Sequence, residues 1–125
     1  MHFNIDTTKE YICICPDTTL IDAKFSELLT VKCQELSKTD SPNFIIDLSK
    51  CTAIDPNFLE PLIETAATFY EQEQSFVIAC PPPAFTQYLK EVDAIDALNY
   101  GPTFIEALDI VKMDIVARDF LQDDL

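Results

Sequence analysis

Five cysteines are the side chains with the clearest capacity for chemistry in this 125-residue sequence. They are Cys13, Cys15, Cys33, Cys51 and Cys80. A catalytic thiolate needs a nearby base, and the single histidine, His2, lies at a chain end that is prone to fraying. An odd number at irregular spacing argues against a disulfide framework. We therefore expect reduced, mostly buried cysteines that behave as small apolar residues.

Two further sequence features limit the chemistry. Gly101 is the only glycine, which excludes a dinucleotide fingerprint and a P-loop because both need several glycines. No Cys-x-x-Cys pair is present, and the acidic residues do not cluster at metal-ligand spacing. We therefore predict no catalytic residue, no metal site and no cofactor. A thiol-based enzyme or redox carrier that uses Cys13, Cys51 or Cys80 is the alternative.

The charge of the chain excludes several classes of partner. The sequence has 8 Lys and Arg against 22 Asp and Glu, a formal net charge of −14. Nucleic acid and anionic membrane surfaces are therefore disfavoured as partners. No apolar run reaches 18 residues, and residues 1–6 lack the features of a signal peptide, so we expect a cytoplasmic protein without membrane insertion. The acidic charge indicates either a basic patch on a protein partner or a device for solubility.

The N-terminal third predicts a hairpin and a helix. Residues 3–5 alternate with polar neighbours and residues 11–15 are continuously apolar, so we expect two antiparallel strands, the second ended by Pro16. Thr19 is expected to cap an amphipathic helix over residues 20–37.

The middle of the chain predicts a strand, a loop and a second helix. Residues 44–48 are apolar and β-branched, as is typical of a strand covered on both faces. A loop over 49–54 then leads to a helix over 57–72. Asp55 supplies a capping carboxylate for it, and Pro56 suits a first helical turn.

The C-terminal third repeats this alternation. Residues 75–80 read as a buried strand, residues 85–92 as a short helix and residues 99–100 as an extended segment. Thr103 is expected to cap a last helix. Residues 113–125 form an acidic extension that either continues this helix or stands apart as a short helix or tail.

This order predicts the fold class. Strands joined through helices indicate an α/β fold with a mixed, mainly parallel sheet of four to five strands, about four helices and an initial β-hairpin. We expect a single domain over residues 1–112.

Three passages resemble the STAS domain, the family named for sulfate transporters and anti-sigma factor antagonists. They are residues 43–49 followed by 52–55, residues 75–80, and residues 94–98 followed by 103–108. The match is good over residues 43–112 and rests on element order over residues 3–42. The resemblance implies a STAS-like fold and a bacterial, cytoplasmic, non-enzymatic regulator that binds another protein.

The loop before the second helix departs from the family pattern. Regulatory members read Asp-Ser-Ser/Thr-Gly there, and a kinase phosphorylates the second hydroxyl residue. Residues 55–58 read Asp-Pro-Asn-Phe instead, so the acceptor position is Asn57, which has no hydroxyl. Thr52 is the nearest upstream hydroxyl and a less favoured substitute. We therefore predict an interaction module that is not switched by phosphorylation at the usual position.

Two residues of this loop have two interpretations each. Asp55 is either a helix cap, which we favour, or a polar anchor of a partner surface. Phe58 is either an exposed binding anchor or a ring packed under the start of the helix, and the sequence leaves this open.

We predict the partner-binding surface at this loop and the start of the following helix. Its candidate residues are Lys50, Thr52, Asp55, Pro56, Asn57 and Phe58. The resemblance implies an anti-sigma-type kinase or a related regulator as the partner. It also leaves open a cytoplasmic subunit of a lipid or anion transporter complex. A small-ligand site at the carboxyl ends of the parallel strands is a further alternative.

Overall fold

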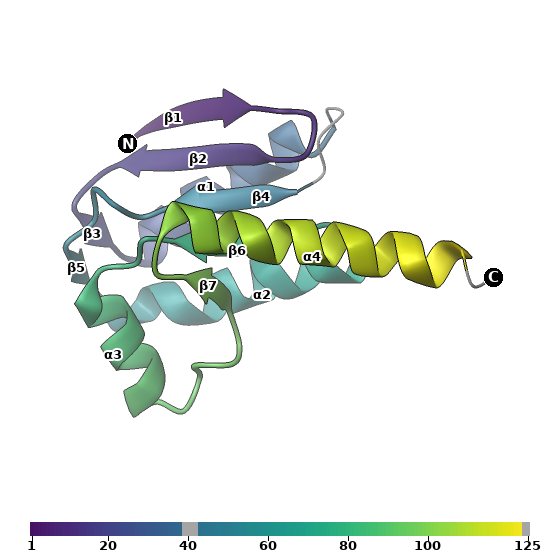
Figure 1. Cartoon of the computed structure of the whole chain (residues 1–125). Helices are drawn as coiled ribbons and strands as arrows, with labels where there is room; N and C mark the ends of the chain where they lie inside the picture. Colours follow the sequence, from purple (N-terminus) through teal and green to yellow (C-terminus); the bar gives the residue numbers. More distant parts are fainter. Residues whose placement is uncertain (39–42, 124–125) are drawn as a thin grey trace.

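The expected alternation of strands and helices builds a five-stranded sheet with helices on both faces (Figure 1). The computed structural model describes residues 1–38 and 43–123. Strands β1 (His2–Thr7) and β2 (Ile12–Asp17) form the antiparallel hairpin. Strands β4 (Phe44–Asp47), β6 (Phe76–Ala79) and β7 (Asn99–Gly101) follow in parallel, in the order β1-β2-β4-β6-β7. The predicted fold class is therefore confirmed.

The helices form the two outer layers. They are α1 (Ala23–Leu36), α2 (Leu59–Glu71), α3 (Pro83–Glu91) and α4 (Phe104–Asp123). A 3-10 turn, η1 (Pro56–Phe58), precedes α2. Because side chains alternate along a strand, the central strands can bury residues on both faces of the sheet.

Each face of the sheet has its own apolar core. On one face, residues such as Phe44 and Ile46 pack against α1, α2 and α3. On the other face, Ile45 and Val77 pack against Ala107 of α4 and its neighbours. Each such side chain contributes roughly 1.5–3 kcal/mol when buried. This double coverage explains the unbroken apolar runs of β4 and β6.

The start of the first helix differs from the prediction. Thr19 does not cap it, and the helix begins at Ala23 rather than residue 20. The reason is a second, two-stranded sheet, in which β3 (Leu20–Ile21) pairs in parallel with β5 (Ala53–Ile54). The chain therefore stays extended up to Asp22, whose Oδ1 accepts a hydrogen bond from Phe25 N at 2.8 Å.

Two other details of the prediction are corrected. Pro16 does not end the second strand, because β2 continues to Asp17. Beyond Ile14, β2 pairs with β1 alone, and proline is tolerated where one side of a strand has no neighbour. The loop over 49–54 is also not entirely irregular, since its last two residues form β5.

The corrected cap gives a direct prediction. We expect Asp22→Ala to lower the free energy of unfolding by about 1 kcal/mol, because the N–H of Phe25 loses its acceptor. Thr19→Ala should change it by less than about 0.5 kcal/mol, since Thr19 contributes its backbone carbonyl to the structure rather than a cap. Urea unfolding of both variants measures the difference. A larger loss of unfolding free energy for Thr19→Ala than for Asp22→Ala would instead support Thr19 as the helix cap, as the sequence predicts.

Helix α4 is anchored along its length by polar contacts as well as by apolar ones. Asp114 Oδ2 accepts hydrogen bonds from the Tyr70 hydroxyl at 2.9 Å and from Ser75 Oγ at 2.7 Å. One turn later, Arg118 donates to Asn43 Oδ1 at 2.8 Å. These bonds join α4 to the ends of α2, β4 and β6. They fix which side of α4 faces the domain.

Candidate functional site

The loop between β4 and α2 presents most of the predicted site residues to solvent. Lys50, Thr52, Asp55, Pro56 and Asn57 are all exposed. The loop lies at the carboxyl ends of the parallel strands, where ligands commonly bind in open α/β sheets. The structure therefore places these five residues in one exposed loop at that end of the sheet.

The backbone of this loop is tied to the segment before α1. The N–H groups of Thr52 and Ala53 both donate to the carbonyl of Thr19, at 2.8 and 3.0 Å. The N–H of Asp55 donates to the carbonyl of Ile21 at 2.8 Å. Together with the pairing of β3 and β5, these bonds tie residues 52–55 of the loop to residues 19–21.

Asp55 has a structural role in the loop. Its Oδ1 accepts a hydrogen bond from the backbone N–H of Asn57 at 3.0 Å, so it caps η1. Pro56 occupies the first position of that turn, where its missing N–H leaves no bond unmade. The Asn57 side chain is left exposed at the turn.

Phe58 lies inside the domain rather than on the site surface. Its side chain has 0% exposure. The ring lies 5.3 Å from the ring of Phe85 and 6.1 Å from that of Tyr88, both in α3. Its carbonyl accepts a hydrogen bond from Ser26 Oγ at 2.7 Å. Of the two interpretations of Phe58, the structure therefore supports packing under the start of the helix. A partner could not contact this ring without displacing the loop.

A groove of about 590 Å³ lies between α2 and α3 and adjoins this loop. Its lining residues are Pro56, Asn57, Leu59, Glu60, Pro61, Ile63, Glu64, Tyr88, Val92 and Ala94. Only Pro56 and Asn57 were predicted as site residues. The α3 side chains have no distinguishing mark in the sequence, because Tyr88 and Val92 read as ordinary apolar helix positions.

A smaller hollow of about 420 Å³ lies on the other side of the loop. Thr52 and Cys80 line it together with Ser49, Cys51 and the prolines at 81–83 and 102. Thr52 therefore faces different neighbours from Asn57. Cys80 is half-buried at the end of β6 and has a left-handed backbone, with φ of 54°.

The thiols near this edge are poorly suited to nucleophilic chemistry. Burial, with the nearby Asp47 carboxylate, raises the pKa of Cys13 to about 12. Burial also raises the pKa of Cys51 to about 11, with smaller contributions from Cys15 and Asp47. The pKa values of Cys15 and Cys80 are raised in the same way. A raised pKa leaves less thiolate at neutral pH, so these groups stay protonated there.

We expect slow alkylation of the native thiols. A pKa near 11 in place of 9.0 lowers the thiolate fraction at pH 7 about a hundredfold. Cys13 and Cys51 should therefore react with iodoacetamide at least about a hundred times more slowly in the native protein than in denaturant. Mass spectrometry of timed samples measures the rates. Rapid modification of one native cysteine would instead favour the thiol-based alternative.

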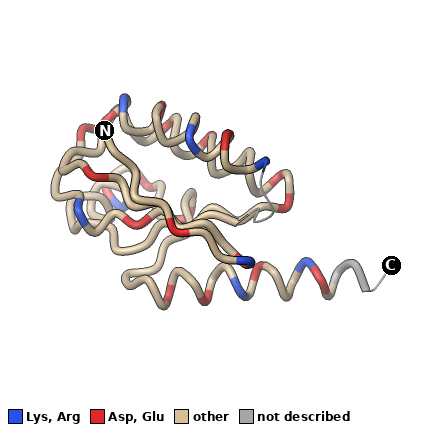
Figure 2. The backbone as a smooth tube through the Cα atoms, turned by 90° about the horizontal axis from the view of Figure 1, so that it is seen from above, with Lys and Arg blue, Asp and Glu red and all other residues tan. Residues whose placement is uncertain are grey.

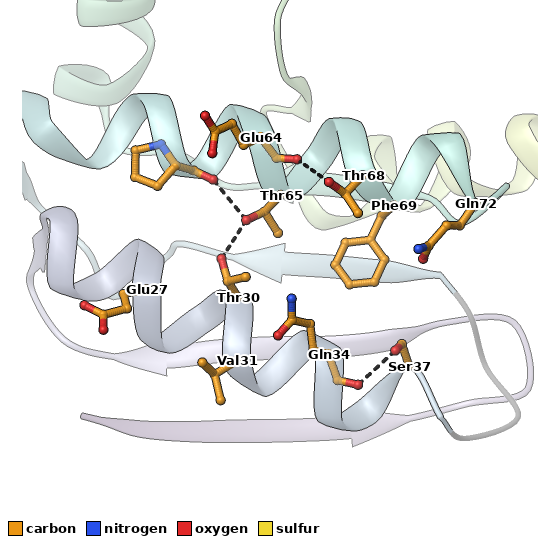
Figure 3. Close-up of a pocket in the computed structure, with 11 residues that line it drawn as sticks. Glu27, Thr30, Val31, Gln34, Ser37, Glu64, Thr65, Thr68, Phe69 and Gln72 are labelled. Carbon is orange, nitrogen blue, oxygen red and sulfur yellow. Dashed lines mark hydrogen bonds between the residues drawn. The ribbon is translucent and has the colours of Figure 1, made fainter.

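A further hollow of about 500 Å³ lies between α1 and α2 (Figure 3). Thr30 Oγ1 and Thr65 Oγ1 point toward one another across it, 2.6 Å apart. Each hydroxyl also lies within bonding distance of a carbonyl in its own helix, at 2.8 and 2.9 Å. The two hydroxyl groups have only two hydrogens for these three contacts. At any moment one hydroxyl therefore donates to the other, or both donate to their helix carbonyls. The described residues that line the hollow include no cysteine, histidine, lysine or arginine. The hollow is therefore a polar contact region between the two helices.

Metal binding and membrane crossing find no support in the described part of the chain. Among residues 1–38 and 43–123, no three His, Cys, Asp or Glu side chains are grouped so that they could hold a metal ion. None of the described helices has the length and apolar character needed to span a bilayer.

Comparison with known proteins identifies the fold. No family model and no curated protein sequence matches the chain. In structure, it is similar to a proposed anti-sigma factor antagonist from Thermotoga maritima, with 16% identity, a TM-score of 0.74, and coverage of 88% of this chain and 94% of the other. A variant of RsbS from Moorella thermoacetica shows 18% identity and a TM-score of 0.71, with coverage of 94% and 99%.

A transporter-linked protein has the same architecture. A sulfate transporter family protein from Wolinella succinogenes matches with 16% identity and a TM-score of 0.66, over 85% of this chain and 86% of the other. These identities are low, and the agreement lies in the arrangement of the elements. The chain therefore has the STAS fold, shared by anti-sigma factor antagonists and by STAS domains of sulfate transporter proteins.

Proposed function

We propose that the chain is a non-enzymatic protein-interaction module that works in the manner of an anti-sigma factor antagonist and is not switched by phosphorylation at residue 57. The observation that carries this proposal is the exposed amide of Asn57 at the turn capped by Asp55. SpoIIAA, an anti-sigma factor antagonist of the same fold, has been solved in unphosphorylated and phosphorylated forms. Asn57 offers no hydroxyl for such a modification.

The proposed contact surface consists of the exposed loop residues and the groove beside them. Lys50, Thr52, Pro56 and Asn57 form the loop part, and Tyr88 and Val92 border the groove. Asp55 supports the surface through its cap rather than as a free anchor. Phe58 belongs beneath it, because its ring is buried.

Charge favours a partner with a basic patch. Asp and Glu residues are spread along the helices and strands (Figure 2), and the net charge is −14. Complementary potentials raise encounter rates, so a basic anti-sigma-type kinase or related cytoplasmic bacterial regulator suits this surface best. Such a partner would dock on the loop and would bind without covalent control.

A charge-matched pair of variants tests the surface. The partner is captured from the native cells with the tagged chain, identified, and titrated against the purified variants. Asn57→Arg should weaken its binding at least about tenfold, because a long cation enters the proposed contact. Gln34→Arg in α1 likewise replaces an exposed neutral amide with arginine and changes the net charge equally, and it should leave binding within about twofold. Equal effects of the two variants would exclude the loop as the contact.

A second experiment tests the absence of phosphorylation control. Intact mass spectrometry of protein from its own cells should show no phosphate adduct of about 80 Da on residues 49–58. Asn57→Ser supplies the missing hydroxyl as a comparison. If the native chain binds no protein and Asn57→Ser becomes both phosphorylated and binding-competent, the proposal is wrong.

A subunit of a lipid or anion transporter complex is the second candidate function. The fold similarity to the Wolinella sulfate transporter family protein favours it. In that case the partner captured by the loop would be a cytoplasmic domain of a membrane complex. Capture from detergent-extracted membranes, compared with capture from the membrane-free fraction, separates the two functions.

A further inference from the structure

Strand β1 forms one border of the five-stranded sheet and has a neighbouring strand on one side only. The strand order places β2 beside it, and Figure 1 shows no other described strand or helix along its outer side. An edge strand presents a row of backbone N–H and C=O groups to which a further strand can bond. β1 has six residues, whereas β7 at the opposite border has three. β1 is therefore the longer template for an added strand.

The hydrogen bonds of β2 determine which backbone groups of β1 point outward. The N–H of Ile12 donates to the carbonyl of Asn43 at 2.8 Å, so the even-numbered residues of β2 bond toward β4 and its odd-numbered residues bond toward β1. In the register of the hairpin, the odd-numbered residues of β2 are paired with the even-numbered residues of β1. Phe3, Ile5 and Thr7 therefore turn their N–H and C=O groups toward the open side of the sheet.

The side chains of β1 alternate between the two faces of the sheet. Asp6 is paired with Cys13, which packs against the core beneath α4, so the even-numbered residues of β1 lie on that face. Phe3 packs at the border of the other core, and Ile5 on the same face is 41% exposed. An apolar side chain that a further strand could cover therefore lies in the middle of β1.

The two ionisable side chains of β1 have opposite signs when charged and lie on one face. His2 and Asp6 are both exposed, and four residues separate them. Within the hairpin, His2 is paired with Asp17 of β2, which places a carboxylate residue beside the imidazole residue. Neither His2 nor Asp6 belongs to an ion pair in the described part of the chain, where Lys32–Glu35 is the only one. Both are therefore available to a strand that pairs with β1.

We propose that β1 pairs antiparallel with β1 of a second copy, about a two-fold axis at Asn4, and so joins the two sheets into one. In this register Phe3 lies opposite Ile5 of the second copy, and the outward N–H and C=O groups of these residues bond to one another. His2 lies opposite Asp6 of the second copy, and the two Asn4 amides face each other. The same strand serves both copies, as a two-fold interface requires.

A second copy is the occupant because the side chains of β1 complement themselves in this one register. Each half of the pairing matches an apolar side chain with an apolar one and His2 with Asp6, and such cross-strand pairs stabilise antiparallel sheets. Only registers that differ by two residues keep the outward backbone groups matched. A shift by two residues in either direction leaves His2 without Asp6 opposite. The acidic excess of the chain lies elsewhere, since Asp6 is the only acidic residue of β1.

Sedimentation equilibrium of the full chain tests the proposal. One strand pair is a small contact, so we expect a weak dimer with a dissociation constant of about 10–100 µM. The measurement uses 0.15 M salt, where the Debye length of about 8 Å limits repulsion between the two acidic copies. Ile5→Pro should weaken the dimer at least about a hundredfold, because proline has no N–H and its ring occupies the pairing side of the strand. The hairpin should stay folded, since proline is tolerated on an edge strand where the N–H faces solvent.

Ile5→Ala is the matched control for Ile5→Pro. It removes most of the same apolar side chain but keeps the outward N–H, so it should weaken the dimer at most about tenfold. Circular dichroism and urea unfolding should show both variants folded. A loss of dimer that is equal in the two variants would mean that the side chain acts without the backbone pairing, and would contradict an added strand.

Two charge variants test the register. His2→Asp and Asp6→Lys should each weaken the dimer roughly tenfold, because each removes both opposite-charge pairs and places like charges together. The two substitutions change the net charge in opposite directions, so a general charge effect would not weaken both dimers. An equimolar mixture should recover the native affinity as a heterodimer, in which each carboxylate lies opposite a basic side chain. A mixture without recovery would overturn the register and the proposal with it.

The exposed apolar side chains of α4 offer the main competing contact between copies. Met113, Val116 and Phe120 are 67–70% exposed. Val116→Glu should leave the β1 dimer within about twofold. A dimer that is lost in Val116→Glu and survives Ile5→Pro would place the contact on α4 and overturn the proposal. A chain that stays monomeric near millimolar concentration would do the same, as would a monomer that binds a foreign extended peptide along β1.

Discussion

Phe58→Ala is expected to lower the free energy of unfolding by about 3–5 kcal/mol. The ring has 0% exposure and packs against Phe85 and Tyr88, so its removal leaves a cavity where η1 meets α3. Domains of this size are stable by only about 5–15 kcal/mol, so the variant should be partly unfolded at moderate denaturant. Urea unfolding with an unchanged slope measures the loss.

Asn57→Ala is the natural comparison for Phe58→Ala. Asn57 is the preceding residue, its side chain is exposed, and only its backbone N–H bonds to Asp55. We expect a change within about 0.5 kcal/mol. If Phe58→Ala instead unfolded like the native protein and lost its partner, the ring would be a binding anchor and not part of the core.

Gly101→Ala is expected to cost about 3 kcal/mol, the second largest effect. A Cβ at residue 101 would lie 2.8 Å from the carbonyl carbon of Glu106 and 2.9 Å from the Cα of Ala107, with the Ala107 nitrogen closer still. These are backbone atoms in the first turn of α4, so no side-chain rotation relieves the overlap. The only glycine of the chain thus allows α4 to lie directly on β7.

Pro102→Ala provides the control for Gly101→Ala. Pro102 follows immediately and is exposed, so its replacement should act mainly through the unfolded chain and cost at most about 1 kcal/mol. Thermal and urea unfolding compare the two variants. Native-like stability of Gly101→Ala would mean that the first turn of α4 moves away from the sheet at little cost.

The sequence predicts those parts of the fold that depend on local patterns. The buried runs at 44–48 and 75–80 contain β4 and β6, because strands covered on both faces are apolar throughout. The cap at Asp55 could be predicted in the same way, since its carboxylate accepts a hydrogen bond from a backbone N–H only two residues away. Thr103 likewise accepts from the N–H of Glu106 at 3.2 Å, as its cap position predicts.

The errors arise where distant segments decide the local conformation. Leu20 and Ile21 fit a helical pattern, but their pairing with residues 53–54 extends them and moves the cap from Thr19 to Asp22. Phe58 could not be placed from the sequence, because its neighbours in α3 lie some thirty residues away. The groove beside the loop has the same origin, since it exists only when α3 packs beside the start of α2.

The two-stranded sheet of β3 and β5 has a consequence for how the loop meets a partner. Three backbone bonds, from Thr52, Ala53 and Asp55 to Thr19 and Ile21, already hold the loop shape in the free chain. Association then requires little loss of conformational freedom, and more of the gross contact energy remains as affinity. The proposed contact surface is thus preformed, so we expect binding by rigid docking, with an encounter rate governed by charge and not by a slow rearrangement.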